Sequence, residues 1–164
     1  MEIMAIDPGN KESAYVVVKD DLSEVLEKGK VENHELLNLL LDFKLKYDIR
    51  CVAIEMIQSY GMSVGATVFE TCVWIGRFKE RCKQLWFETE FVYRKEEKML
   101  LCHSMKAKDS NIMQALIDLF AKDTPNRGKG TKKNPGYFYG FSKDVWSAMA
   151  VAYVYHTKYI GTEC

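Results

Sequence analysis

Three acidic residues lie in settings where a carboxylate is costly unless it has a partner. Asp7 ends an apolar run at a Pro-Gly turn, and Glu55 lies near the end of the apolar segment CVAIEM. Asp144 lies in the first turn of a predicted helix. A buried acid needs a compensating partner, and an oxygen-only set of ligands suits Mg²⁺ or Mn²⁺ rather than zinc. Two such ions about 3.5 to 4 Å apart can activate a water and stabilise the leaving oxygen of a phosphodiester.

Each acid also has a purely structural interpretation. Asp is among the residues favoured at turns, so Asp7 could simply cap the turn that follows it. An acid in the first turn of a helix is favoured by the helix dipole, which accounts equally well for Asp144 taken alone. The spacing of the three acids does not decide between these interpretations.

The elements that must position these acids follow from apolar patterns. Continuous apolar runs predict buried strands, and apolar residues at intervals of three or four predict helices. The predicted elements are strands at 3–6, 13–18 and 24–30, a helix at 33–47, a strand at 51–56, a helix at 63–85, a strand at 87–93, a helix that begins at Asp109 or Ser110, and a helix at 142–155. The helix that begins near residue 109 has a predicted core face of Ile112, Leu116, Leu119 and Phe120.

This order of elements predicts a mixed sheet with helices on both faces. The helix at 33–47 provides the crossover that parallel pairing of the first strand and the Glu55 strand requires. Ligands of open sheets of this kind bind beyond the carboxyl ends of the strands. Because Asp7 and Glu55 both lie at those ends, we expect the two carboxylates to converge on one crevice, with Asp144 as a third.

Composition places few limits on function. The 164 residues include 48% hydrophobic and 28% charged residues, which is typical of a globular domain. Lys and Arg number 23, as do Asp and Glu, so any nucleic-acid partner must be held by local basic patches. Five scattered cysteines without a C-x-x-C pair predict reduced thiols. With no predicted signal peptide or spanning segment, we expect an intracellular, cytoplasmic protein.

Four segments in order resemble a known family. AIDPGN, SAYVVV, CVAIEM and KDVWSAMAVAY are similar to segments of the RuvC-like Holliday-junction resolvases, particularly the small phage-type members, within the ribonuclease H-like superfamily. The resemblance spans nearly the whole chain and implies a single RuvC-like nuclease domain at 1–164. It implies a five-stranded mixed sheet of order 3-2-1-4-5 with strand 2 antiparallel. It also implies that Asp7, Glu55 and Asp144 are catalytic acids that bind two Mg²⁺ ions, for which Mn²⁺ can substitute.

One position departs from the family pattern. Cellular members usually have two aspartates three residues apart on the last helix, whereas Asp144 is followed at that position by Ser147. A hydroxyl cannot supply the charge of a carboxylate, so a second metal would bind more weakly at Ser147, through water, or through an acid elsewhere. Glu70 and Asp118 are two available acids, and the sequence does not choose between them.

Cleavage of DNA also requires basic side chains that bring phosphates to the acids. A glycine-rich segment just before the last helix holds four of them, and two more precede the predicted helix start near residue 109, whose free N–H groups favour phosphate. A solvated surface loop is the alternative for both clusters. In the family, an aromatic residue in the loop after the second acid wedges the junction open, and Tyr60 is the candidate here. The predicted DNA-binding residues are Tyr60, Lys106, Lys108, Arg127, Lys129, Lys132 and Lys133.

The sequence therefore predicts a metal-dependent, structure-selective endonuclease that resolves four-way and other branched DNA junctions. The phage-type resemblance implies a phage-encoded protein in a bacterial host. Two symmetric cuts require two active sites, so the resemblance implies a homodimer, to which the helix at 63–85 could contribute the interface. Two alternatives stay open: a junction-binding protein with little hydrolytic activity, and a ribonuclease H that acts on RNA–DNA hybrids. Trp74, Trp86 and Trp146 are expected in the core or at a subunit contact.

Overall fold

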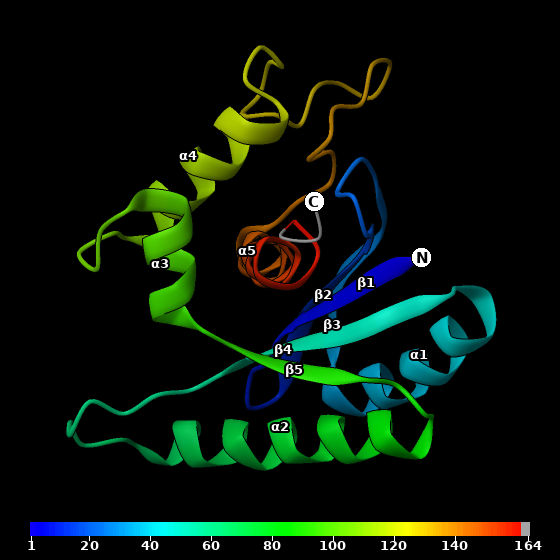
Figure 1. Cartoon of the computed structure of the whole chain (residues 1–164), viewed down its shortest axis with the longest axis vertical. Coiled ribbons are helices and arrows are strands. Elements are labelled where there is room, and N and C mark those ends of the chain that lie inside the picture. The colour runs from blue at the N-terminus through cyan, green and yellow to red at the C-terminus, as the bar shows by residue number, and fades with distance from the viewer. Residues whose placement is uncertain (162–164) are drawn as a thin grey trace.

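The computed structural model describes residues 1–161, which form a five-stranded sheet with helices on both faces (Figure 1). The elements are β1 (Glu2–Asp7), β2 (Glu12–Lys19), β3 (Val25–Glu32), α1 (Asn33–Lys46), β4 (Ile49–Met56), α2 (Ala66–Gln84), β5 (Thr89–Tyr93), α3 (Arg94–Cys102), α4 (Asp109–Phe120) and α5 (Lys143–Tyr159). The strand order is β3-β2-β1-β4-β5, with β2 antiparallel to β1 and β3, and with β1, β4 and β5 parallel. The predicted fold class, strand order and antiparallel strand 2 are confirmed.

The central strands are buried on both faces because successive side chains enter two different cores. One core lies between the sheet and α3, α4 and α5, and the other lies between the sheet and α1 and α2. This alternation explains why β1 and β4 are continuous apolar runs. On the α5 side lie Ile3, Ala5, Cys51 and Ala53, and on the opposite side lie Met4, Ile6, Val52 and Ile54.

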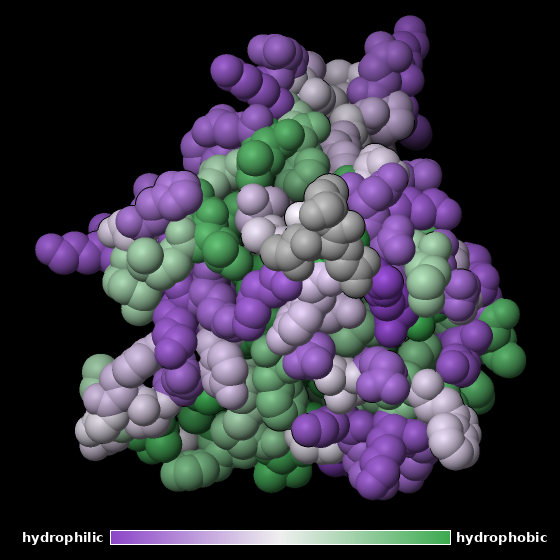
Figure 2. All heavy atoms as spheres, viewed as in Figure 1, coloured by the Kyte–Doolittle hydropathy of each residue, from purple (hydrophilic) through white to green (hydrophobic). Residues whose placement is uncertain are grey.

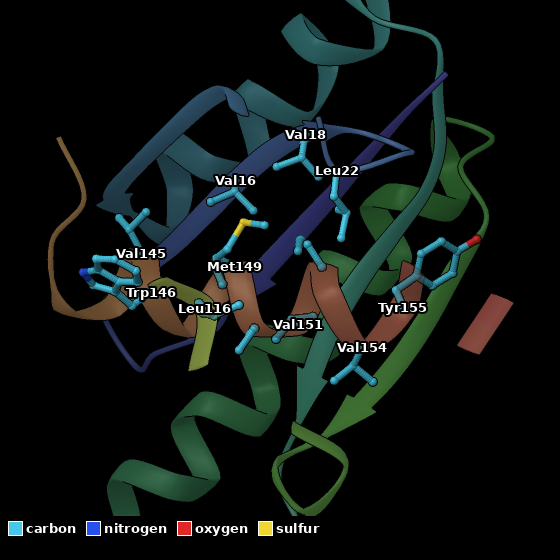
Figure 3. Close-up of a cluster of buried hydrophobic side chains, with 14 of the residues drawn as sticks. Val16, Val18, Leu22, Leu116, Val145, Trp146, Met149, Val151, Val154 and Tyr155 are labelled. Atoms are coloured by element: carbon cyan, nitrogen blue, oxygen red, sulfur yellow. The ribbon is translucent and has the colours of Figure 1, made fainter. Parts of the chain in front are cut away.

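Helix α5 lies at the centre of its face because its side chains are small enough for close packing. Ala148, Ala150 and Ala152 are fully buried, and α5 packs across β1 and β2. Figure 3 shows larger side chains of α5, including Met149, in the same apolar cluster as Val16 of β2. The close contact fixes the start of α5, and with it Asp144, relative to the end of β1.

The opposite face is covered by α1 and α2. Leu36 and Leu40 of α1 and Phe78 of α2 are fully buried against the sheet. None of the helices in residues 1–161 is both long and apolar enough to cross a membrane. Four cysteines in the described part are free thiols, as predicted, and Cys164 lies outside it.

Several local predictions need correction. Helix α3 was not predicted as a separate element, because its nine residues RKEEKMLLC are mostly polar. Helix α2 begins at Ala66 rather than near residue 63, since Gly65 is in extended conformation and forms its N-cap. Leu119 is 54% exposed and therefore does not belong to the core face of α4. Trp86 is 89% exposed, which excludes it from the core.

Candidate active site

The register of the sheet brings Asp7 and Glu55 to the same place. Strands β1 and β4 pair in parallel with Ala5 opposite Ala53 and Ile6 opposite Ile54, so the next step of this register sets Asp7 beside Glu55. By the same alternation that directs Ala5 and Ala53 to the α5 side, both acids belong to that side. Asp7 and Glu55 therefore lie close together, as predicted, because their strands pair in register and both side chains point to the same face of the sheet.

Glu55 affects the ionisation of Asp7. Burial first, then the charge of Glu55 and a hydrogen bond with its side chain, together raise the pKa of Asp7 to about 8. Burial also raises the pKa of Glu55 to about 7, with the charge of Glu97 as the next cause. The raised pKa favours the protonated form of Asp7, and a bound cation would relieve the same repulsion.

Asp144 approaches the pair from the first turn of α5. Its charge is among the causes that raise the pKa of Asp7, so the third predicted acid lies within electrostatic reach. Its Oδ2 accepts a hydrogen bond of 2.6 Å from Nζ of Lys30 on β3, an ion pair that the sequence analysis missed. Asp7, Lys30 and Asp144 line one cleft of about 320 Å³.

The loop that follows Asp7 is fixed by a small buried network. The backbone N–H of Gly9 donates to Oγ of Ser13, and the carbonyl of Gly9 accepts from Nδ2 of Asn33. Oγ of Ser13 in turn donates to Oδ1 of Asn33 at 2.6 Å. A Cβ at Gly9 would lie 2.3 Å from the carbonyl oxygen of Glu12, so only glycine fits this turn. The network holds the end of β1 and therefore the backbone of Asp7.

A further acid, absent from the sequence predictions, lies near these groups. Glu97 of α3 is fully buried, and its Oε2 accepts a 2.6 Å hydrogen bond from Nη1 of Arg94. Burial raises the pKa of Glu97 to about 7, and the charge of Asp7 also contributes. Glu97 was missed because the unpredicted helix α3 positions it. An acid inside a short charged helix carries no sequence signal of burial.

The chemistry of this donor set fits a hard divalent cation. Carboxylate oxygens are the ligands that Mg²⁺ prefers, and the mutual repulsion of Asp7 and Glu55 would be relieved by such an ion. In residues 1–161, however, no three His, Cys, Asp or Glu side chains are already arranged around one metal position. The hydrogen bonds explain this, because Asp144 is paired with Lys30 and Glu97 with Arg94. A cation bound here would take the place of the proton that the raised pKa of Asp7 favours and of the Lys30 contact of Asp144.

The position on α5 where cellular family members have a second aspartate is occupied by Ser147. Ser147 is half-buried and lines a second cleft of about 330 Å³, together with Arg94 and residues of α4. Of the two acids proposed as substitutes, Glu70 is exposed and accepts a hydrogen bond from Asn10, and Asp118 is exposed and accepts one from Gln114. Neither substitute is buried with the acids.

Two of the predicted basic residues belong to this second cleft. Arg127 and Lys129 line it with Lys143 and with the first residues of α4. Their segment is folded on itself: Gly130 N–H donates to the Pro125 carbonyl, and Phe138 N–H donates to the Gly128 carbonyl. The glycine-rich segment therefore has a defined backbone conformation and forms one side of the cleft that Ser147 lines.

The remaining predicted DNA-binding residues lie on exposed loops. Tyr60 is 63% exposed in the loop between β4 and α2, and its hydroxyl donates to Gln58. Lys106 and Lys108 are exposed before α4, where Lys108 is the N-cap residue. Lys132 and Lys133 are exposed in the segment that continues from Lys129, but they do not line the second cleft.

Comparison with known proteins supports the fold. No protein-family model and no curated protein sequence matches the chain. Among solved structures, it is similar to Thermus thermophilus RuvC in complex with a Holliday junction substrate, with a TM-score of 0.69 and 14% identity over 94% of this chain and 92% of that chain. Yeast mitochondrial Holliday junction resolvase Ydc2 gives a TM-score of 0.57 and 11% identity over 94% and 77%. The large terminase nuclease of the thermophilic phage G20c gives 0.50 and 13% over 93% and 81%.

The strand order and the similarity to these structures define the fold as α/β of the ribonuclease H-like type. Within that class, the chain has the RuvC-like fold, as the sequence resemblance predicted. At 11 to 16% identity, this likeness establishes the fold, and the chemistry must be argued from the site.

Proposed function

We propose that this protein is a divalent-metal-dependent, structure-selective DNA endonuclease that resolves four-way (Holliday) and other branched junctions by phosphodiester hydrolysis. The observation that carries the proposal is the register that sets Asp7 beside Glu55 at adjacent strand ends, where the pKa of each is raised, with Asp144 close enough to affect the pKa of Asp7. The fold of two Holliday-junction resolvases supports the choice of substrate.

In this proposal, Asp7, Glu55 and Asp144 hold two Mg²⁺ ions, with Mn²⁺ as a substitute, and Ser147 contributes a hydroxyl oxygen. The bound ions supply Lewis acidity for the attacking water and for the leaving oxygen. The carboxylates position the ions, and the Gly9 network keeps Asp7 in place. Displacement of Lys30 from Asp144 leaves an ammonium group at the cleft, where it can contact a DNA phosphate.

The basic residues define a path for the DNA backbone. Arg127 and Lys129 flank the cleft beside Ser147, and Lys106 and Lys108 lie before the N-terminus of α4. Helix N-termini and Lys or Arg side chains both attract phosphates. Lys132 and Lys133 extend the basic segment outward. We assign to Tyr60 the stacking of an unpaired base, since its ring is exposed in the loop that follows Glu55.

Symmetric resolution requires a homodimer, and α2 provides the supporting surface. Its outward residues Phe69 and Val73 are 61% and 63% exposed, one helical turn apart, and Met62 in the preceding loop is 76% exposed. Figure 2 shows hydrophobic side chains along the lower edge of the molecule, where Figure 1 places α2. A self-complementary apolar stripe of this kind suits a two-fold contact. A nuclease of recombining DNA acts inside the cell, and the phage-type resemblance suggests a phage-infected bacterium.

Incubation of the purified protein with a labelled four-way junction tests the proposal. We expect paired nicks in Mg²⁺ or Mn²⁺ and none in EDTA, with linear duplex and an RNA–DNA hybrid cut at least about 100-fold more slowly, a difference of about 2.7 kcal/mol in barrier. Equal cutting of the hybrid would favour a ribonuclease H instead.

A second candidate function is a junction-binding protein with little hydrolytic activity. The hydroxyl at Ser147 and the Lys30–Asp144 ion pair favour it, because both reduce the negative charge available for a metal. Tight junction binding without product in either Mg²⁺ or Mn²⁺ would support this candidate and contradict the endonuclease proposal.

A further inference from the structure

One buried carboxylate oxygen has no explanation in the packing of the protein. In the part of the chain that the structure describes, Oε1 of Glu97 is the one buried side-chain nitrogen or oxygen without a hydrogen-bond partner. The side chain is fully buried, and its other oxygen binds Arg94. Buried polar atoms in folded proteins are almost always satisfied, so an exception points to an absent ion, water or ligand.

The position of Glu97 relative to the other acids follows from the chain path. Glu55 pairs with Val92 of β5, and α3 begins two residues later at Arg94. Glu97 therefore lies in the first turn of the helix that leaves the sheet beside Glu55. The register of β1 and β4 sets Asp7 beside Glu55, so three carboxyl groups from β1, β4 and α3 lie at one end of the sheet.

Arg94 holds Glu97 in this position. Its Nη1 donates to Glu97 Oε2, and its Nη2 pairs with Asp109 at the start of α4. The guanidinium group therefore ties α3 to α4 while it leaves Oε1 of Glu97 unoccupied. A planar Arg fork is well suited to orient one carboxylate oxygen and leave the other available.

We propose that Glu97 supplies the fourth carboxylate of the metal site, replacing the acid that α5 lacks at Ser147, and that Arg94 positions it. This inference rests on the proposed function, since it assigns an additional ligand to the same metal site. The fourth acid would then come from α3, whereas in cellular family members it comes from the last helix. Ser147 lines the cleft that is also lined by Arg94, the residue that holds Glu97.

Calorimetric titration with Mn²⁺ tests the assignment without relying on catalysis. We expect Glu97→Gln to lose one of two bound ions or at least about 10-fold in affinity, equivalent to about 1.4 kcal/mol. Glu70→Gln and Asp118→Asn, the two acids available from the sequence, serve as matched controls and should bind Mn²⁺ like the wild type. Wild-type binding by a folded Glu97→Gln variant would overturn the inference.

A double variant sharpens the test. If Glu97 and position 147 serve the same ion, Ser147→Asp in the Glu97→Gln background should recover at least about 3-fold in Mn²⁺ affinity, since it supplies the carboxylate that α5 lacks. No recovery would count against the shared role. If Glu97→Gln does not fold, Glu97→Asp keeps the charge but shortens its reach, and an unchanged Mn²⁺-dependent rise in Tm for that variant would overturn the inference.

Failure of the inference can be distinguished from failure of the proposed function. Loss of Mn²⁺ binding in Asp7→Asn, combined with normal binding in Glu97→Gln, would leave the proposed nuclease site intact and remove Glu97 from it. Absence of Mn²⁺ binding in the wild type would instead contradict the proposed metal-dependent nuclease itself.

Discussion

The two faces of the sheet carry the same kind of core but end differently. On the α1 and α2 face, the side chains from β1 and β4 are apolar to the last inward position, and α2 buries Phe78 and Ile75 there. On the α5 face, the same strands end in Asp7 and Glu55, with Glu97 buried nearby. The first face is apolar at this end of the two strands, whereas the second holds like charges in a part-buried space. The comparison teaches that the apolar face stabilises the protein at all pH values, whereas the acidic end of the other face costs stability when its carboxyl groups are ionised.

The largest expected effect is on catalysis and concerns the α5 face alone. Asp7→Asn should lower the rate of junction cleavage at least about 10³-fold, equivalent to about 4 kcal/mol, because the neutral amide cannot hold a cation. Junction binding, measured by mobility shift in EDTA, should change less than about 3-fold. A variant that cuts at the wild-type rate would remove Asp7 from the mechanism.

The second prediction concerns the apolar face. Phe78→Ala should lower the free energy of unfolding by about 3–5 kcal/mol, since it removes a fully buried ring and leaves a cavity. Urea unfolding followed by circular dichroism measures the change. Under conditions where the variant is folded, its Mn²⁺ affinity should match that of the wild type, and a loss of affinity would show that the two faces are coupled.

The third prediction concerns the pH dependence of stability at the acidic end of the sheet, where, in contrast to Phe78→Ala, a substitution should stabilise the protein. The folded pKa of Asp7 is about 8 against an ordinary value of 3.8, so between about pH 4 and 8 the folded chain keeps a proton that the unfolded chain releases. The contribution of Asp7 to stability is therefore present at acidic pH and is lost as pH rises through that window.

Asp7→Asn removes this dependence and should stabilise the metal-free protein by about 1–2 kcal/mol at pH 8, a value reduced for partial exposure. Thermal unfolding in EDTA at pH 5, 6.5 and 8 measures it. An Asp7→Asn variant that is less stable than the wild type at pH 8 would contradict the view that this end of the sheet is strained by charge.

The smallest expected effect concerns the basic wall of the second cleft. The double variant Arg127→Ala/Lys129→Ala should weaken junction binding about 10-fold and reduce the slope of log affinity against log salt by about 2, as two phosphate contacts are lost. Lys83→Ala, an exposed lysine at the end of α2 on the other face, is the control and should change neither quantity. An unaltered salt slope in the double variant would mean that the DNA takes another path.

The sequence predicted well where a pattern is long or where chemistry marks it. Apolar runs identified the core strands, and the strand–helix–strand order led to the mixed sheet that the structure confirms. The structure brings Asp7, Glu55 and Asp144 to one end of the sheet, and their catalytic role stays a prediction. The prediction was poorest at short charged segments. Helix α3 is short and mostly polar, so neither it nor its buried Glu97 was foreseen.

The sequence by itself determined which strand ends carry acids, because the period of two along a strand fixes the face of each side chain. Only the tertiary structure decided the partners of those acids. Lys30 and Asp144 are 114 residues apart, and the contact between them arises from packing of α5 across the sheet. Glu97 is buried only because α3 folds back toward α5. Local patterns encode direction and periodicity, whereas burial and charge pairing depend on distant segments that no local pattern specifies.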